Sequence, residues 1–178
     1  MNQQMAEQFA AKFGKLPPAL RQQLSKMKLG VEYLDLTLQR TYRGYFFMGQ
    51  ASMVIPQEGL LFGDAFFQSI VLHEMGHAVD LDIPSADWRT AMNADGFSVS
   101  QYSKTLPQED FAETYYAWYL VRTGMVDPAV TSDLESKFAN RFWLLDRSAS
   151  ARNTLPPEKR PEVDFVRFPA GHSSGENG

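Results

Sequence analysis

Two histidines and one glutamate stand together in the segment His73-Glu74-Met75-Gly76-His77. Residues four apart on an α-helix point the same way, so both imidazoles could reach one cation. Zinc is commonly held by imidazole and carboxylate groups in a tetrahedral arrangement. Glu74 lies about 100° around the helix from His73, where it could take a proton from water without acting as a ligand. The spacing therefore predicts a metal site with a general base beside it.

Inert, hydrogen-bonded histidines also occur in protein cores, and a five-residue pattern can arise by chance. The surroundings favour a site. The helix that we expect over 65–81 is apolar almost all the way around, so three polar side chains on it would need partners. Gly76 also costs helix stability, on the order of 1 kcal/mol relative to alanine. We therefore expect close packing beside the two histidines.

A catalytic zinc needs a third protein ligand. Proteases with an extended motif place a histidine or an aspartate six residues after the second histidine, but here that residue is Ile83. Asp80 and Asp82 lie too close to the helix end to turn back easily, although Asp80 could orient the site. His172 would be a fragile ligand because it lies near the end of the chain.

The helix expected over 107–122 offers Glu109, Asp110 and Glu113 instead. Glu109 and Glu113 share a face, and Asp110 points about 100° away. One glutamate could bind the metal while the other accepts a hydrogen bond from a ligand histidine. Periodicity does not say which glutamate has which role. A solvated acidic face at a helix start is the alternative, but the aromatic and apolar flanking residues predict a mostly buried helix.

The segment from His73 to Asp80, with Tyr102 and the segment from Glu109 to Glu113, resembles the catalytic domain of anthrax lethal factor and the related bacterial Pro-Pro endopeptidases. The zinc motif is shared by many families. More discriminating is a tyrosine seven residues before the first of two glutamates that stand four apart. The resemblance covers residues 73–113 and implies a zincin-like metallopeptidase domain that cleaves a protein or peptide substrate.

The resemblance also implies roles for individual residues. One Zn²⁺ per chain would be held by His73, His77 and Glu109. Glu74 would be the general base, and Glu113 would contact a metal ligand without binding the metal itself. Tyr102 would donate a hydrogen bond to the developing oxyanion. A phenol just before the third-ligand helix could reach the substrate side, where such a donor strengthens as charge builds on the carbonyl.

The apolar run Gly59-Leu60-Leu61-Phe62 comes just before the expected active-site helix. In zinc peptidases of this general shape, an edge strand at this point pairs with an extended substrate. We therefore expect these four residues to contact the substrate through such a strand.

The rest of the chain predicts an α+β domain with N-terminal helices, a small mixed sheet, the active-site helix and C-terminal helices. Apolar periodicity and Pro/Gly positions predict helices over 2–13, from 17, and over 65–81, 85–92, 107–122 and 127–147, with strands over 31–38, 44–48 and 52–55. Expected helix caps are Asp64, Ser85 and Thr105, Asp127-Pro128 is expected to open the last helix, and Gly124 is an expected stop.

We expect one metallopeptidase domain over residues 1–150, whose first 30 residues are helical, and a partly disordered tail over 151–178 that holds four prolines and three glycines. Leu16-Pro-Pro and Leu155-Pro-Pro are typical of helix starts and linkers. If the chain were a Pro-Pro endopeptidase, the second could be a self-substrate.

Composition excludes several classes of protein. The 178 residues include no cysteine, which excludes disulfides and thiolate metal sites, and the net charge of −4 argues against non-specific nucleic-acid binding. We expect no membrane span, no secretory signal and a monomer; the resemblance suggests secretion or translocation. Two alternatives remain open: an intracellular regulatory metallopeptidase that cuts a partner protein, and an inactive zinc-binding interaction module.

Overall fold

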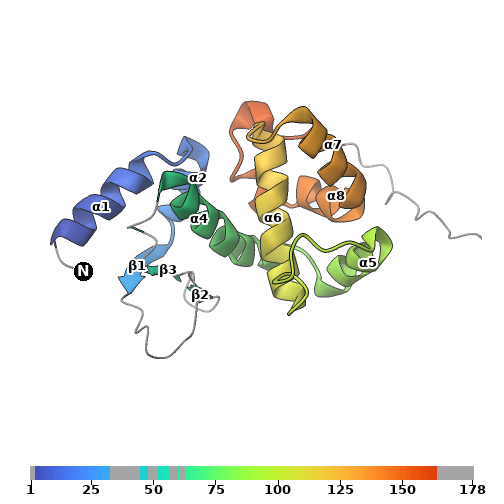
Figure 1. Cartoon of the computed structure of the whole chain (residues 1–178), viewed down its shortest axis with the longest axis horizontal. Helices are drawn as coiled ribbons and strands as arrows, with labels where there is room; N and C mark the ends of the chain where they lie inside the picture. The colour runs from blue at the N-terminus through green and yellow to red at the C-terminus, as the bar shows by residue number, and fades with distance from the viewer. Residues whose placement is uncertain (1–2, 33–44, 48–51, 57–59, 61–62, 164–178) are drawn as a thin grey trace, which may run out of the picture.

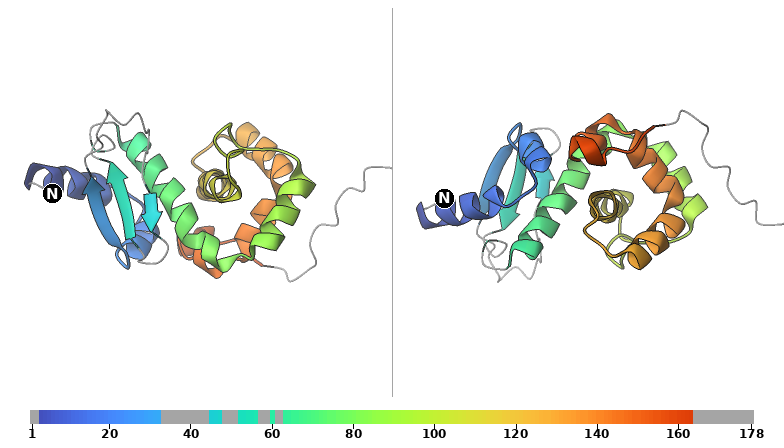
Figure 2. Two further views of the ribbon diagram at one scale, coloured as in Figure 1. Left: turned by 90° about the horizontal axis from the view of Figure 1, so that it is seen from below. Right: turned by 90° about the horizontal axis from the view of Figure 1, so that it is seen from above.

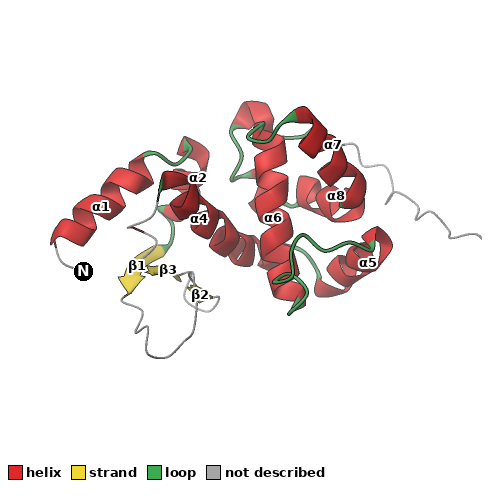
Figure 3. Ribbon diagram, in the orientation of Figure 1, coloured by secondary structure: helices red, strands yellow, loops and turns green. Residues whose placement is uncertain are grey.

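The computed structural model describes residues 3–32, 45–47, 52–56, 60 and 63–163. Within these residues the chain forms helices and one small sheet, which confirms the α+β class (Figures 1 and 3). The elements are α1 (Gln3–Gly14), α2 (Pro18–Leu24), β1 (Lys28–Glu32), β2 (Tyr45–Phe47), β3 (Ser52–Pro56), α4 (Asp64–Val79), η3 (Asp80–Asp82), α5 (Ser85–Asp95), α6 (Pro107–Thr123), α7 (Pro128–Lys137), α8 (Ala139–Arg147), α9 (Ala149–Arg152) and η4 (Pro157–Lys159).

The sheet is mixed, as expected, and its strands have the order β1-β3-β2. The central strand β3 pairs in parallel with β1, with Lys28 opposite Ser52 and Glu32 opposite Pro56, and antiparallel with β2. β1 starts before the strand that we expected over 31–38, of which residues 33–38 lie outside the described part of the chain. One sheet edge is therefore the short strand β2.

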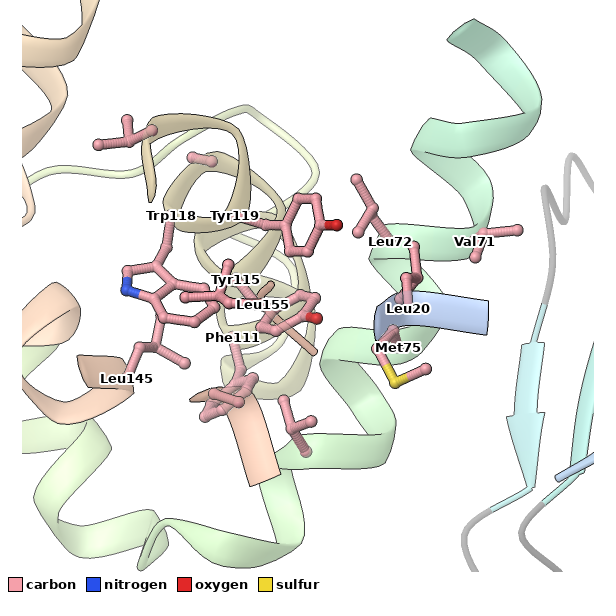
Figure 4. Packing of buried hydrophobic residues seen from close by; sticks show 14 of the residues in the cluster. Leu20, Val71, Leu72, Met75, Phe111, Tyr115, Trp118, Tyr119, Leu145 and Leu155 are labelled. Atoms are coloured by element: carbon pink, nitrogen blue, oxygen red, sulfur yellow. The ribbon is translucent and has the colours of Figure 1, made fainter. Parts of the chain in front are cut away.

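Helix α4 lies between the two parts of the molecule (Figure 2). The sheet and the N-terminal helices are on one side of it, and α6 is on the other, with α5, α7 and α8 around α6. This position explains why α4 is apolar on almost every face. Figure 4 shows Val71 pointing toward the sheet and Leu72 toward Tyr119 of α6, and all three side chains are buried.

Three expected N-caps are wrong, and in two cases proline sets the helix start. Pro107 is the first residue of α6 and Pro84 precedes α5, so Leu106 and Pro84 take the cap positions without a side-chain cap bond, instead of Thr105 and Ser85. Proline has a fixed φ and lacks an N–H, which suits the first turn and holds the residue before it extended. Asp64 is a helical residue and pairs with Lys15 at 2.7 Å.

The expected helix over 127–147 is two helices. Asp127-Pro128 opens α7 as expected, and the Asp127 side chain caps it by accepting from the backbone N–H groups of Ala129 and Val130. The chain leaves the helical conformation at Phe138, with φ −118° and ψ 27°, and α8 follows. No proline or glycine marks this break. It is accompanied only by tertiary packing, since the Phe138 ring is buried with the Arg141 guanidinium 4.6 Å from its centroid.

The tail does not begin at residue 151. Ala151, Thr154 and Leu155 are fully buried, and the Tyr115 hydroxyl donates to Thr154 Oγ1 at 2.8 Å. Our expectation of a tail is therefore wrong for residues 151–155, which pack against α6 as part of the folded body. The composition of this region is typical of turns, so it did not indicate a short buried segment. Residues 164–178, including His172, lie outside the described residues.

Both Leu-Pro-Pro segments start helical turns. Leu16 and Leu155 are buried, and the prolines that follow them have nearly the same backbone angles, φ −52° and ψ 140° at Pro17 and φ −53° and ψ 141° at Pro156. The next residues, Pro18 and Pro157, are the first of α2 and of η4. The expectation that these segments begin helices is confirmed.

Candidate metal centre

The centre lies where α4 crosses α6 at very short range. A Cβ atom built on Gly76 would lie 2.6 Å from the Cα of Ala112, closer than real Cβ atoms approach backbone. Gly76 stands between the two histidines of α4, and Ala112 stands between the two glutamates of α6. The missing side chain therefore lets the four polar groups converge, and the expected close packing at Gly76 is confirmed.

The two imidazoles and the nearer carboxylate form a compact group. The ligand atoms of His73, His77 and Glu109 all lie within 4.8 Å of one another. Glu109 Oε2 is 3.1 Å from His73 Nε2 and 3.6 Å from His77 Nε2. These three residues, which the resemblance implied as ligands, therefore form a group that could hold a metal ion.

Glu113 holds His73 from the other side of the ring. His73 Nδ1 lies 3.0 Å from Glu113 Oε1, and because a carboxylate can only accept, Nδ1 must donate the proton. This contact fixes the ring orientation and directs Nε2 toward His77 and Glu109. Glu109 and Glu113 thus have the two different roles that periodicity could not assign.

The charges of the group are strongly coupled. Burial alone would lower the pKa of His73, but its hydrogen bonds to Glu109 and Glu113 outweigh burial and raise the pKa to about 9. Burial alone would raise the pKa of Glu109, but the two imidazoles hold that pKa below its usual range. These opposite shifts favour a protonated His73 beside an ionised Glu109 in the metal-free chain.

Glu74 is buried beside this group and incompletely hydrogen-bonded. Only 3% of the residue is exposed, and Oε2 has no hydrogen-bond partner among the described residues. Burial raises the pKa of Glu74 to about 7, which the charges of His73 and His77 only partly oppose. A carboxyl group with a pKa near neutrality can both accept and release a proton.

Tyr102 lies at the open side of the group. It is 52% exposed, and its ring centroid is 5.9 Å from that of His73. Ser100 and Ser103 fix the turn around it, because the hydroxyl of each accepts from the backbone N–H of the other at 3.1 Å. Partial burial and the Glu109 carboxylate raise the pKa of Tyr102 to about 12, so the phenol keeps its proton.

Two other expected site residues, Asp80 and Leu60, are described by the structure. Asp80 ends α4, where burial raises its pKa and His77 opposes that rise, but no hydrogen bond joins the two among the described residues. Leu60 is helical and buried, which does not fit the expected substrate-pairing strand. Gly59, Leu61 and Phe62 lie outside the described residues.

Asp110, the third acid considered as a ligand, belongs to a different cluster. Its carboxylate accepts from Arg141 at 2.7 and 2.9 Å and from the Trp88 indole at 3.1 Å. Sequence reasoning missed Arg141. Its acidic partners, Asp95 and Asp110, lie 46 and 31 residues away along the chain, so no local spacing could have indicated the contact.

The chain matches no family model, no curated protein and no solved structure. Among the described residues, no helix combines the length and the apolar character needed to cross a bilayer.

Proposed function

We propose that this chain is a zinc-dependent endopeptidase with a zincin-like core, of the kind found in lethal factor and the Pro-Pro endopeptidases. One observation carries the proposal: two imidazoles from α4 and one carboxylate from α6 lie within 4.8 Å of one another. The mixed sheet next to α4, with the short strand β2 at one edge, suits such a core.

The donor set favours zinc among the common divalent ions. Magnesium and calcium prefer oxygen ligands, whereas two imidazoles with one carboxylate form a usual catalytic zinc set that leaves a fourth position open. Zinc held by His73, His77 and Glu109 would polarise the scissile carbonyl and acidify the attacking water.

Glu74 is the proposed general base. Its unpartnered Oε2 and its pKa of about 7 suit a group that takes a proton from the attacking water and passes it to the leaving amine. The absence of a hydrogen-bond partner for Oε2 among the described residues is costly for a purely structural carboxylate. A role in proton transfer gives that atom a function.

Tyr102 and Glu113 complete the proposed machinery. Tyr102 keeps its proton and lies beside His73, so it can donate to the oxyanion as charge develops on the substrate. Glu113 keeps His73 Nδ1 protonated, which leaves Nε2 as the ligand atom. Each of these groups is a side chain of α4, of α6 or of the loop before α6.

The substrate that we propose is a protein or peptide, bound by a monomeric enzyme. A diverse peptide library, incubated with the zinc-loaded protein with and without a chelator, tests this proposal. We expect chelator-sensitive internal cleavage, and the cleaved sequences would show whether the enzyme prefers Pro-Pro bonds.

The matched control is Glu74→Gln, which should retain zinc and lose about 100- to 10,000-fold in cleavage rate. Normal cleavage by this variant would show that Glu74 is not the base. A wild-type protein that binds zinc and cleaves no peptide would instead be an interaction module.

A further inference from the structure

Arg141 of α8 is an arginine without solvent exposure inside the helical part of the molecule. Its Nε donates to Asp95 at 2.8 Å, its Nη1 donates to Asp110 at 2.7 Å, and its Nη2 donates to the backbone oxygen of Phe97 at 2.6 Å. Both aspartate side chains are only 1% exposed. Each of the three guanidinium nitrogens therefore donates to an acceptor of the chain, and two of these acceptors are buried carboxylates.

Two of these three acceptors lie on elements that carry proposed active-site groups, and the third ends the helix that leads into the Tyr102 loop. Asp95 ends α5, and Phe97 begins the loop that contains Tyr102. Asp110 is in the first turn of α6, directly after Glu109. One side chain thus joins the start of the Tyr102 loop to the turn that presents the third proposed ligand.

The first turn of α6 needs such support. The cap residue Leu106 provides no side-chain hydrogen bond to that turn, and first turns without one are prone to fray. In addition to the backbone hydrogen bonds of the turn, the Asp110 carboxylate anchors it to α8 through Arg141 and to α5 through Trp88.

We propose that Arg141 is a positioning residue, which sets the Glu109 carboxylate and the Tyr102 loop against the histidines of α4. This inference rests on the proposed metal site. A buried ion pair is weak evidence for a gain in stability, because desolvation offsets most of the attraction. Orientation of a ligand is a function that such a pair performs well, and loss of the supporting contacts of ligands typically weakens metal binding.

Helix α6 also supplies a matched control. Arg122, near the C-terminal end of α6, donates to both carboxylate oxygens of Asp146, at 2.9 and 2.8 Å, and also to Glu135. This cluster joins α6 to α7 and α8, as the Arg141 cluster joins α6 to α5 and α8. Unlike the Arg141 cluster, the Arg122 cluster lies more than three helical turns from Glu109.

The test compares Arg141→Lys with Arg122→Lys in the full chain. Lysine keeps the charge but cannot donate to three separate acceptors in a fixed fork. Zn²⁺ affinity is measured by competition with a chromophoric chelator, the geometry of the site by the visible absorption of bound Co²⁺, and stability by thermal melting. We expect Arg141→Lys to weaken zinc binding about 10- to 100-fold and to change the Co²⁺ spectrum. Arg122→Lys should lower the melting temperature and leave both metal measurements unchanged.

A folded Arg141→Lys protein with wild-type affinity and spectrum would overturn the proposal, and so would equal losses of affinity in the two variants. If Arg141→Lys does not fold, Trp88→Phe decides, because it removes only the indole donor to Asp110 and retains an aromatic ring. It should weaken zinc binding several-fold, and its melting temperature is measured as well, because the smaller ring also leaves a cavity beside Phe111. Wild-type affinity in this variant would count against the proposal. Failure of the wild-type protein to bind zinc would instead contradict the proposed function.

Discussion

Two clusters of charged side chains meet on neighbouring residues of α6, and they differ in almost every respect. Glu109 belongs to the open cluster, with the two histidines, Glu113 and Glu74, while Asp110 belongs to the closed cluster, with Arg141 and Asp95. In the open cluster, the side chains of His73 and Glu109 are each 16% exposed. In the closed cluster, no side chain of the ion pairs is more than 1% exposed.

The two clusters differ in how far their hydrogen bonds are satisfied within the chain. In the closed cluster each nitrogen of Arg141 donates to an acceptor of the chain, so the hydrogen bonds of the guanidinium are satisfied within the protein. In the open cluster, Glu74 Oε2 has no hydrogen-bond partner among the described residues, and His73 Nε2 and Glu109 Oε2 face each other at 3.1 Å. Such incomplete satisfaction points to a bound partner outside the chain.

The largest expected effect separates Glu109 from Asp110. We expect Glu109→Ala to lose zinc at moderate chelator concentrations and to abolish cleavage while the protein stays folded. Asp110→Ala leaves Arg141 partly unpaired in the core and should destabilise the fold by about 3–5 kcal/mol. Metal content after chelator treatment and urea unfolding of both variants check this prediction. A folded Glu109→Ala protein that retains its zinc would contradict the assignment of Glu109 as the third ligand.

The next effect contrasts two tyrosines. Tyr102→Phe removes the proposed oxyanion donor and should lower kcat about 100- to 1,000-fold without a change in stability. Tyr115→Phe removes the buried hydrogen bond to Thr154 and should cost about 1 kcal/mol of stability while kcat is retained. Turnover and melting, measured on both proteins, would sharpen the comparison. Unchanged turnover in Tyr102→Phe would leave that residue without a catalytic role.

A smaller effect is expected at the helix crossing. Gly76→Ala places a methyl group against the Ala112 backbone, which should cost about 1–3 kcal/mol and weaken zinc binding by moving α4 away from α6. Gly63→Ala is the matched control, since a Cβ there would meet no atom of the described residues within 4 Å. If Gly76→Ala binds zinc as well as wild type, the open cluster does not depend on this close approach.

The smallest effect is a pH dependence of the metal-free protein. The folded pKa of His73 is about 9, above its ordinary value of 6.5. Its contribution to stability is therefore complete below pH 6.5 and is lost as the pH rises to about 9. In chelator, the free energy of unfolding should fall over this window by no more than about 1.4 kcal/mol per pH unit. Glu113→Gln should reduce the slope, and an unchanged slope would contradict our account of the proton in the open cluster.

The open cluster could be found from the sequence because its signals are local. Histidines four apart, glutamates four apart and a glycine between the histidines are all patterns of single helices, and the structure brings those residues together. Which glutamate lies nearer the histidines depends on the crossing of two helices. The periodicity of each helix alone does not show which glutamate is the nearer one.

The closed cluster and several boundaries could not be predicted, because they depend on tertiary contacts. Arg141 lies far along the chain from Asp95 and Asp110, and the helix break at Phe138 has no proline or glycine to mark it. The N-cap predictions were wrong for a reason that is visible in the local sequence. At Thr105 and Ser85, a neighbouring proline set the helix start in place of the polar residue.

The burial of Thr154 and Leu155 limits how far this protein can be shortened. A truncation at residue 150, where the composition changes, would remove the hydrogen-bond partner of Tyr115 and leave a hole beside α6. A shortened chain should therefore extend at least through Pro161, whose backbone oxygen accepts a hydrogen bond from Arg152.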